Sequence, residues 1–295
     1  MNKIFLILPI LLTLFSSCET NLELDLGENK SLLILNAFAG NDSLVKVHLS
    51  RSTAIQDRLP AENVTDAIVE LYEEGTLMGR LQPKGNEWYE MDYRFKSDKD
   101  YQIKVNELNK NIIGSRTRIP YIVPISEIKL VRTESKRRYF KLKFHDRKLE
   151  RDYYMILIKC VYEQSGDFGT FTLEQELSYY STDLVFNGNL IENTNTLERN
   201  YLLGSRAFSD KSFNGQEAEI SFYADPYDPW GTCSYLKFEL YHISKDYYAY
   251  ERSKTILTNR EDLPIYKKIN QYSNVDSGAG IFAGYALSTA NLKVE

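Results

Sequence analysis

The chain has 295 residues, enough for two domains, and 43% of them are hydrophobic, which is sufficient for packed cores. Its net charge of −5, with no dense stripe of lysine and arginine, disfavours a nucleic-acid-binding function. The 22 tyrosines suit half-buried strand faces, where the ring packs on the core and the hydroxyl meets water. The composition therefore favours a β-protein that works outside the cytoplasm.

The first 18 residues predict export and lipid attachment. Lys3 supplies a positive charge, and the apolar run over residues 4–15 is too short to span a membrane as a stable helix. Two serines then precede Cys18 in a pattern that resembles a bacterial lipobox, although a phenylalanine departs from the usual aliphatic residue. We therefore expect residues 1–17 to be a lipoprotein signal peptide and Cys18 to be lipidated. An ordinary signal peptide followed by a chance cysteine is the alternative.

Residues 18–30 predict an acidic tether that holds the folded part away from the membrane. Acidic residues alternate here with leucines, so a short edge strand is the alternative. Acidic residues directly after a lipidated cysteine also resemble the export signals that send some Bacteroidota lipoproteins to the cell surface. The sequence leaves the face of the outer membrane open.

Residues 31–119 predict an Ig-like or prealbumin-like β-sandwich. From Leu32 onward, apolar residues recur at every second position, in short segments separated by turn residues. The part over residues 64–105 resembles the prealbumin-like or carboxypeptidase-regulatory-like module, in which a hairpin precedes an aromatic strand and a further alternating strand. We expect strands over residues 33–38, 45–49, 68–72, 77–81 and 101–105, and one that begins at residue 88.

Two prolines within residues 119–124 interrupt strand pairing and predict a boundary. A second, larger β-sandwich domain is expected over residues 125–295, where the alternation resumes. Residues 153–161 are almost continuously apolar, as in a central strand that is buried on both faces. One short α-helix is expected at about residues 245–258, with Ser244 as its N-cap. The predicted fold class is mainly β, with two sandwich domains.

Cys160 and Cys233 remain once Cys18 is lipidated, and an exported protein permits them to pair. Strand alternation argues against pairing. Cys160 shares the apolar face of its strand, whereas Cys233 shares a face with Lys237 and Glu239. We therefore expect two free thiols, an expectation that a β-bulge would reverse.

No group of residues in the sequence predicts a reaction. The three histidines, His48, His145 and His242, are far apart in the sequence and match no zinc-binding pattern. No Gly-x-Ser-x-Gly nucleophile elbow occurs. We therefore expect no cofactor, no metal and no enzymatic activity.

The most concentrated binding candidate is the segment over residues 223–231. Its prolines pre-set turns, and Tyr227 and Trp230 can form an exposed stacking platform for a sugar or another planar ligand. A stiff hairpin whose tryptophan covers the end of the sandwich is the alternative. The platform is the one ligand-binding site that the sequence suggests.

Residues 272–285 carry the most specific pattern, YSNVDSGAGIFAGY. Together with ISKDYYAY at residues 243–250 and VHLSRS at residues 47–52, this ending resembles the domain of unknown function 4249 family. These are Bacteroidota lipoproteins, often encoded beside TonB-dependent outer-membrane receptors. We interpret the motif as structural, because its glycines allow close backbone approach and its isoleucine and phenylalanine can fill a core. A loop for a ligand or partner is the alternative.

The resemblance implies a non-enzymatic, lipid-anchored outer-membrane protein. It would be an accessory or ligand-capture subunit beside a TonB-dependent transporter, with no nucleic-acid partner. Two other classes stay open. A surface hydrolase acting on glycans or peptides would need two acids facing each other in a cleft, and a structural or adhesive surface protein would have no pocket.

Overall fold

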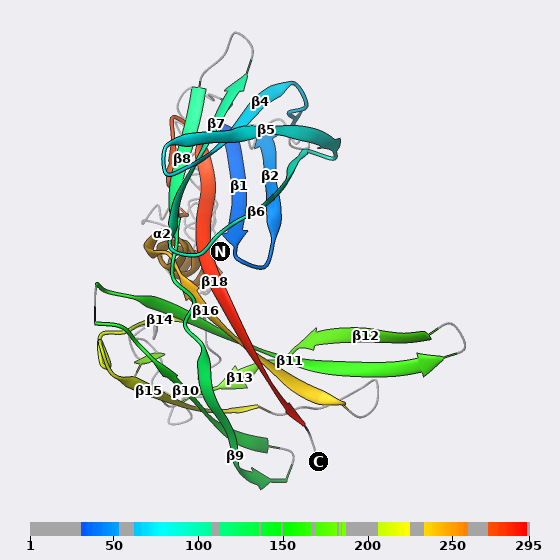
Figure 1. The fold of residues 1–295 in the computed structure, drawn as a ribbon, viewed down its shortest axis with the longest axis vertical. Coiled ribbons are helices and arrows are strands. Elements are labelled where there is room, and N and C mark those ends of the chain that lie inside the picture. Colours follow the sequence, from blue (N-terminus) through cyan, green and yellow to red (C-terminus); the bar gives the residue numbers. More distant parts are fainter. Residues whose placement is uncertain are drawn as a thin grey trace, which may run out of the picture.

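The computed structural model describes residues 31–52, 62–107, 112–135, 137–148, 150–166, 169–181, 183, 185–186, 206–224, 233–258 and 271–293. This part of the chain is mostly β, and its one α-helix is α2 (Lys245–Thr258), as Figure 1 shows. The predicted mainly β class and the predicted helix are thereby confirmed. None of the described helical structure is long and apolar enough to cross a membrane.

The first half of the chain surrounds one hydrophobic core. Apolar residues at every second position place Val45, Val47 and Leu49 of one strand inside that core, as the alternation predicts. Neighbouring strands pair in the order β1-β2-β6-β5-β4-β7-β8, so the sheet curls round the core from both sides. The strands are β1 (Leu33–Gly40), β2 (Leu44–Arg51), β3 (Glu62–Asn63), β4 (Ala67–Glu73), β5 (Thr76–Gly85), β6 (Trp88–Arg94), β7 (Lys99–Glu107) and β8 (Ile112–Ile119).

The second half builds another core between two sheets. The four-stranded sheet β13-β15-β10-β9 lies on one side, and strands β11 and β16 of the larger sheet lie on the other. Strand β11 pairs with β16 on one edge and with β12 and β14 on the other, so its predicted central position is confirmed. The strands are β9 (Ile125–Glu134), β10 (Arg137–His145), β11 (Tyr153–Gly166), β12 (Gly169–Glu176), β13 (Tyr179–Tyr180), β14 (Ala207–Ser209), β15 (Glu217–Ala224) and β16 (Tyr235–Ile243).

One long strand, β18 (Ala279–Lys293), joins the two cores. Its first part pairs in parallel with β1, and its second part pairs antiparallel with β16 (red strand in Figure 1). The short strand β17 (Val275–Asp276) pairs with β8 and closes the far edge of the same sheet. Phe282 therefore packs in the first core, although the sequence places it in the second domain. The two domain ranges stay a prediction.

The segment before and inside β18 explains why the C-terminal motif is structural. A Cβ atom on Gly280 would lie 2.0 Å from the carbonyl oxygen of Leu35, and the φ angle of Gly280 is +108°, so only glycine fits. The Asn274 side chain accepts a hydrogen bond from the Phe282 N–H at 2.9 Å and donates one to the Phe282 carbonyl at 2.8 Å. Ile281 and Phe282 are fully buried. The motif thus docks β18 against β1.

The expectation of two free thiols is wrong, because Cys160 and Cys233 form a disulfide. The alternation of strand β16 does not reach Cys233. Strand β16 begins at Tyr235, so Cys233 lies before it, in a segment where the Ser234 N–H donates to the Val161 carbonyl. The chain turns there, and the Cys233 side chain is buried beside β11 instead of following the solvated face.

The substitution Gly280→Ala should lower the free energy of unfolding by about 3 kcal/mol, because the added methyl group collides with backbone and the φ angle is unfavourable for alanine. The measurement is chemical denaturation. Gly75→Ala is the matched control: its φ is +81°, but nothing lies within 4 Å of the new Cβ, so it should cost about 1 kcal/mol. Equal losses for the two variants would contradict the close approach of β18 to β1.

Candidate functional site

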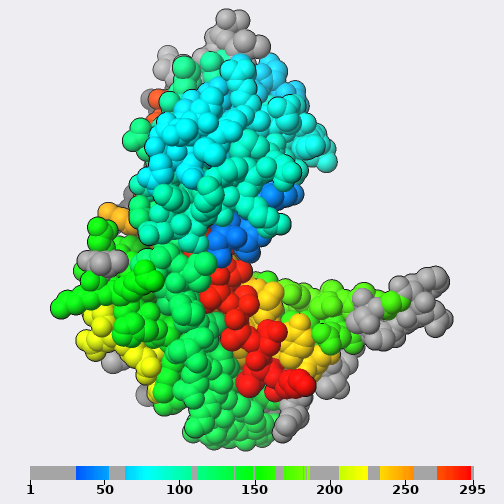
Figure 2. All heavy atoms as spheres, viewed as in Figure 1, coloured from blue at the N-terminus to red at the C-terminus, as the bar shows by residue number. Residues whose placement is uncertain are grey.

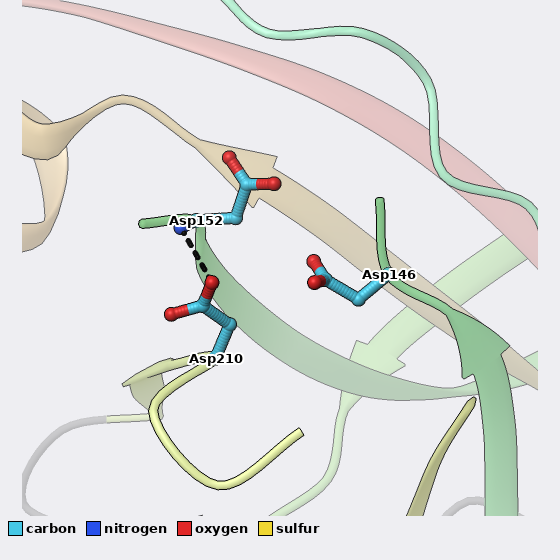
Figure 3. Close-up of side chains that lie close together, drawn as sticks. All are labelled: Asp146, Asp152 and Asp210. Carbon is cyan, nitrogen blue, oxygen red and sulfur yellow. Dashed lines mark hydrogen bonds between the residues drawn. The ribbon is translucent and has the colours of Figure 1, made fainter. Parts of the chain in front are cut away.

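Three aspartates meet where strands of the second half begin and end. Asp146 follows β10, Asp152 precedes β11 and Asp210 follows β14. Strand β14 pairs with the start of β11, which brings Asp210 beside Asp152. One carboxylate oxygen from each residue lies within 4.8 Å of the others, as Figure 3 shows. We call these three residues the aspartate cluster.

Asp146 is fully buried and accepts two hydrogen bonds from the protein. The Tyr154 hydroxyl donates to Oδ1, and the Gly215 N–H donates to Oδ2 at 2.7 Å. The neighbouring Asp146 N–H donates to the Gln216 carbonyl at 3.0 Å. The carboxylate therefore fixes the turn between β14 and β15 against the end of β10.

Asp152 is bound by a tyrosine and a histidine. The Tyr121 hydroxyl donates to its Oδ2 at 2.7 Å, and His242 Nε2 lies 3.1 Å from its Oδ1. The other ring nitrogen of His242, Nδ1, lies 2.9 Å from the Tyr121 carbonyl oxygen, which can only accept. Both ring nitrogens of His242 thus have partners within the protein. Because Tyr121 comes from the connection between the two halves, this network ties that connection to β11 and β16.

The pKa values of Asp152 and Asp210 are shifted in opposite directions. Burial alone would raise the pKa of Asp152, but hydrogen bonds from His242 and Tyr121 outweigh it and hold that pKa below its ordinary value. Burial raises the pKa of Asp210, and the nearby charges of Asp146 and Asp152 raise it further. Burial and the adjacent carboxylate also raise the pKa of Tyr154. The surroundings thus lower the pKa of Asp152 and raise that of Asp210 beside it.

Three carboxylates at this spacing are also a possible set of ligands for a hard cation such as Ca²⁺. Five of their six oxygens, however, already accept hydrogen bonds from the chain or contact His242. The remaining oxygen, Oδ1 of Asp210, has no hydrogen-bond partner. Figure 3 shows that it points away from Asp146 and Asp152. The donor set fits a self-bonded polar network better than a metal site.

The His242–Asp152 pair is likewise poorly placed for acid–base catalysis. A general base needs a nitrogen that reaches the substrate, whereas both ring nitrogens of His242 contact the protein. The His242 side chain is 2% exposed, and the ring lies between Tyr121 and Tyr154 at centroid distances of 4.6 and 4.9 Å. The arrangement can hold charge and orient strands, but it offers no nitrogen to a ligand.

A cavity in the first half of the chain has a volume of about 260 Å³. Its wall includes the ion pair between Arg51 and Glu107, beside Ser277 of the C-terminal motif. Pockets for drug-sized ligands usually measure roughly 300–1,000 Å³. This cavity therefore suits at most a very small ligand.

The residues proposed from the sequence fall in different places. Cys18, Tyr227 and Trp230 lie outside the described residues, so their predicted roles stay predictions. His48 is half-buried on β2, with Nε2 2.5 Å from Glu87, and His145 is exposed at the end of β10. The histidines do not come together.

Sequence reasoning missed the aspartate cluster. Part of a signal was present, because Asp152 directly precedes the strand predicted over residues 153–161. The position of Asp210 and the contact with His242 depend on strand pairing across more than fifty residues. No local pattern reports such pairing.

Comparisons with known proteins add a family and little else. The family model described as "Domain of unknown function (DUF4249)" matches residues 19–290. No curated protein matches the chain. Among solved structures, a Parabacteroides merdae β-glucuronidase is similar over 90% of this chain and 25% of its own, with 10% identity and a TM-score of 0.20. Bacteroides uniformis β-glucuronidase 3 is similar over 72% and 23%, also with 10% identity and a TM-score of 0.20. The chain thus spans about a quarter of these enzymes, at a similarity too low to support an argument.

Two isosteric substitutions distinguish the roles within the aspartate cluster. Asp152→Asn should lower the free energy of unfolding at pH 7 by about 3 kcal/mol, because His242 loses its carboxylate. Since the native pKa of Asp152 is lowered, this loss should shrink as pH falls below about 4. Asp210→Asn keeps an acceptor for the Asp152 N–H, and removes a carboxyl group whose pKa is raised.

Asp210→Asn should therefore be neutral or stabilising at pH 7, with any gain disappearing in acid, where both side chains are uncharged. Denaturant titrations of both variants between pH 3 and pH 8 give the free energy of unfolding at each pH and so measure both trends. Each trend should have the size expected when the pKa of a single buried carboxyl group is shifted. A large loss at pH 7 for Asp210→Asn would show that its charged form is needed, and would reopen the interpretation as a cation site.

Proposed function

Because this chain belongs to the family described as domain of unknown function 4249, we propose its function from its own residues: it is a lipid-anchored, non-enzymatic binding protein of the bacterial outer membrane. It serves as an accessory or ligand-capture subunit beside a TonB-dependent transporter. Its mechanism is binding. A tether raises the local concentration of captured cargo near the transporter pore without any chemical step.

The observation that carries this proposal is Cys18, which follows a short apolar segment and two serines and precedes an acidic stretch. An acyl chain on Cys18 holds the protein at a membrane, and a second signal makes the attachment stable. The association with the transporter is the second signal that we propose.

The non-enzymatic part of the proposal is supported by the state of the polar groups. In the described residues, the aspartate cluster is bonded internally and His242 is enclosed. A glycan hydrolase needs two carboxyl groups about 5–10 Å apart that face each other across a substrate. The carboxyl groups of Asp146 and Asp152 instead accept hydrogen bonds from the protein itself. Tyr227 and Trp230 are the proposed contacts for a sugar or planar cargo.

The substitution Cys18→Ala should abolish acylation and release the protein from the membrane fraction. Mass spectrometry of the native protein measures the first effect, and membrane fractionation measures the second. Ser17→Ala is the matched control, because it keeps a small residue before the cysteine, so acylation should persist. An unmodified Cys18, or a retained segment over residues 1–17, would overturn the proposed location.

The partner is tested separately, by isolating the protein from its own membranes in mild detergent at native expression. We expect a large β-barrel receptor to be recovered with it, and recovery to fall when Cys18→Ala removes the anchor. Trp230→Ala should leave the receptor in the isolate, since it is proposed to contact cargo only. Repeated absence of a receptor would contradict the transporter association while leaving the lipid anchor intact.

A further inference from the structure

Strand β12 is a free edge of the larger sheet. It pairs with β11 on one side, and no strand of the described residues pairs with it on the other. The pairing runs without a register shift from Glu176 opposite Lys159 to Gly169 opposite Gly166. Every second N–H and C=O group along β12 therefore faces outward, unpaired by any described strand. Such a row is a template for another strand.

Three other edge strands in the described part of the chain are protected. Strands β13 and β17 have only two residues each. Strand β9 is ten residues long, but its pairing with β10 contains two register shifts, and it carries Lys129 and Arg132. Short strands, bulges and basic residues all prevent edge-to-edge pairing. Strand β12 has eight residues with no bulge, no lysine and no proline.

The distal part of the β11–β12 hairpin stands clear of both cores, as the light green arm in Figures 1 and 2 shows. Strand β16 pairs with β11 only as far as Val161, so beyond that residue the hairpin is a two-stranded ribbon. Phe171 and Leu173 lie in this ribbon and are 59% and 53% exposed. An isolated two-stranded ribbon is only marginally stable in water, and a third strand would stabilise it.

We propose that β12 pairs antiparallel with β12 of a second copy of this chain, about a two-fold axis at Thr172. In that register, Phe171 lies opposite the second copy's Leu173, and Leu173 lies opposite the second copy's Phe171. Cross-strand pairs between an aromatic and an aliphatic side chain stabilise sheets. The sequence of β12 is thus self-complementary, as a two-fold interface requires.

The charges on β12 agree with this register. Glu174 lies opposite Thr170 of the second copy, so no like charges face each other. A register centred on Glu174 would oppose two glutamates and is disfavoured. Glu174 is already paired with Lys159 and Lys237, and Glu176 is paired with Arg206. The glutamates of β12 are therefore neutralised without a basic partner strand.

The two-strand interface is small, so self-association should depend on concentration and be weak in dilute solution. It rests on the described β12 strand and not on the proposed function. A membrane anchor would favour it by confining the copies to one surface.

Cysteine cross-linking of the full-length protein tests the register. Thr172→Cys should form a disulfide-linked dimer on oxidation, because residue 172 faces itself across the axis. Thr170→Cys is the matched control: its two copies would be about 13 Å apart along the strands, beyond disulfide reach. The parent chain gives the background. Equal cross-linking of the two variants, or none above background for Thr172→Cys, overturns the proposal.

Sedimentation at increasing protein concentration tests the apolar contact. Leu173→Lys should shift the dimerisation constant at least tenfold toward monomer, because it places a charge opposite Phe171. Leu130→Lys changes an exposed leucine on the protected edge β9 and should leave association unchanged. Unaltered dimerisation of Leu173→Lys overturns the proposal. If β12 instead receives the strand of another protein, Thr172→Cys will fail to cross-link with itself.

Discussion

The docking of β18 against β1 is the contact on which the arrangement of the rest depends. The last strand of the chain lies in parallel beside the first described one, and it then continues as the partner of β16. The fit needs Gly280 at the point of closest approach and Asn274 to bridge the backbone of Phe282. Parallel pairing between distant segments carries a high loop-closure cost, which the burial of Ile281 and Phe282 offsets.

Polar contacts then fix the junction between the two cores. The Ser288 hydroxyl donates to the Val123 carbonyl at 2.7 Å, which attaches the connection between the halves to β18. The aspartate cluster attaches the same connection to β11 and β16 through Tyr121. Ser244 caps α2 and also accepts from the Gly284 N–H. A buried polar network of this kind specifies one arrangement, because each alternative would leave charged groups unpaired.

Local structure was largely predictable, and contacts between distant residues were not. Alternating apolar residues located β2 and β4, and Ser244 located the start of α2, since both signals depend on neighbours in sequence. The Asp152–His242 contact and the Cys160–Cys233 bond depend on which strands pair, and alternation along one strand carries no such information. The C-terminal motif was correctly interpreted as structural, but its partner strand β1 could not be read from glycine spacing.

Ion pairs and a disulfide hold the base of the β11–β12 hairpin in place, next to the exposed edge of β12. Lys159 lies 2.8 Å from Glu239 and 3.3 Å from Glu174, and Lys237 bridges the same two glutamates at 3.2 and 3.0 Å. Although burial opposes it, contact with these glutamates raises the pKa of Lys159, so the ammonium stays charged. The neighbouring Cys160–Cys233 disulfide adds a covalent tie at this level of β11.

The firm base limits how far the distal ribbon can move, which lowers part of the entropic cost when another strand binds there. The rigid base and the unprotected edge are therefore complementary parts of one binding element. The aspartate cluster is not available for binding in this way, because its carboxylates already accept hydrogen bonds within the fold. In this protein the polar interior holds the strands in place, and the exposed backbone of β12 remains for recognition.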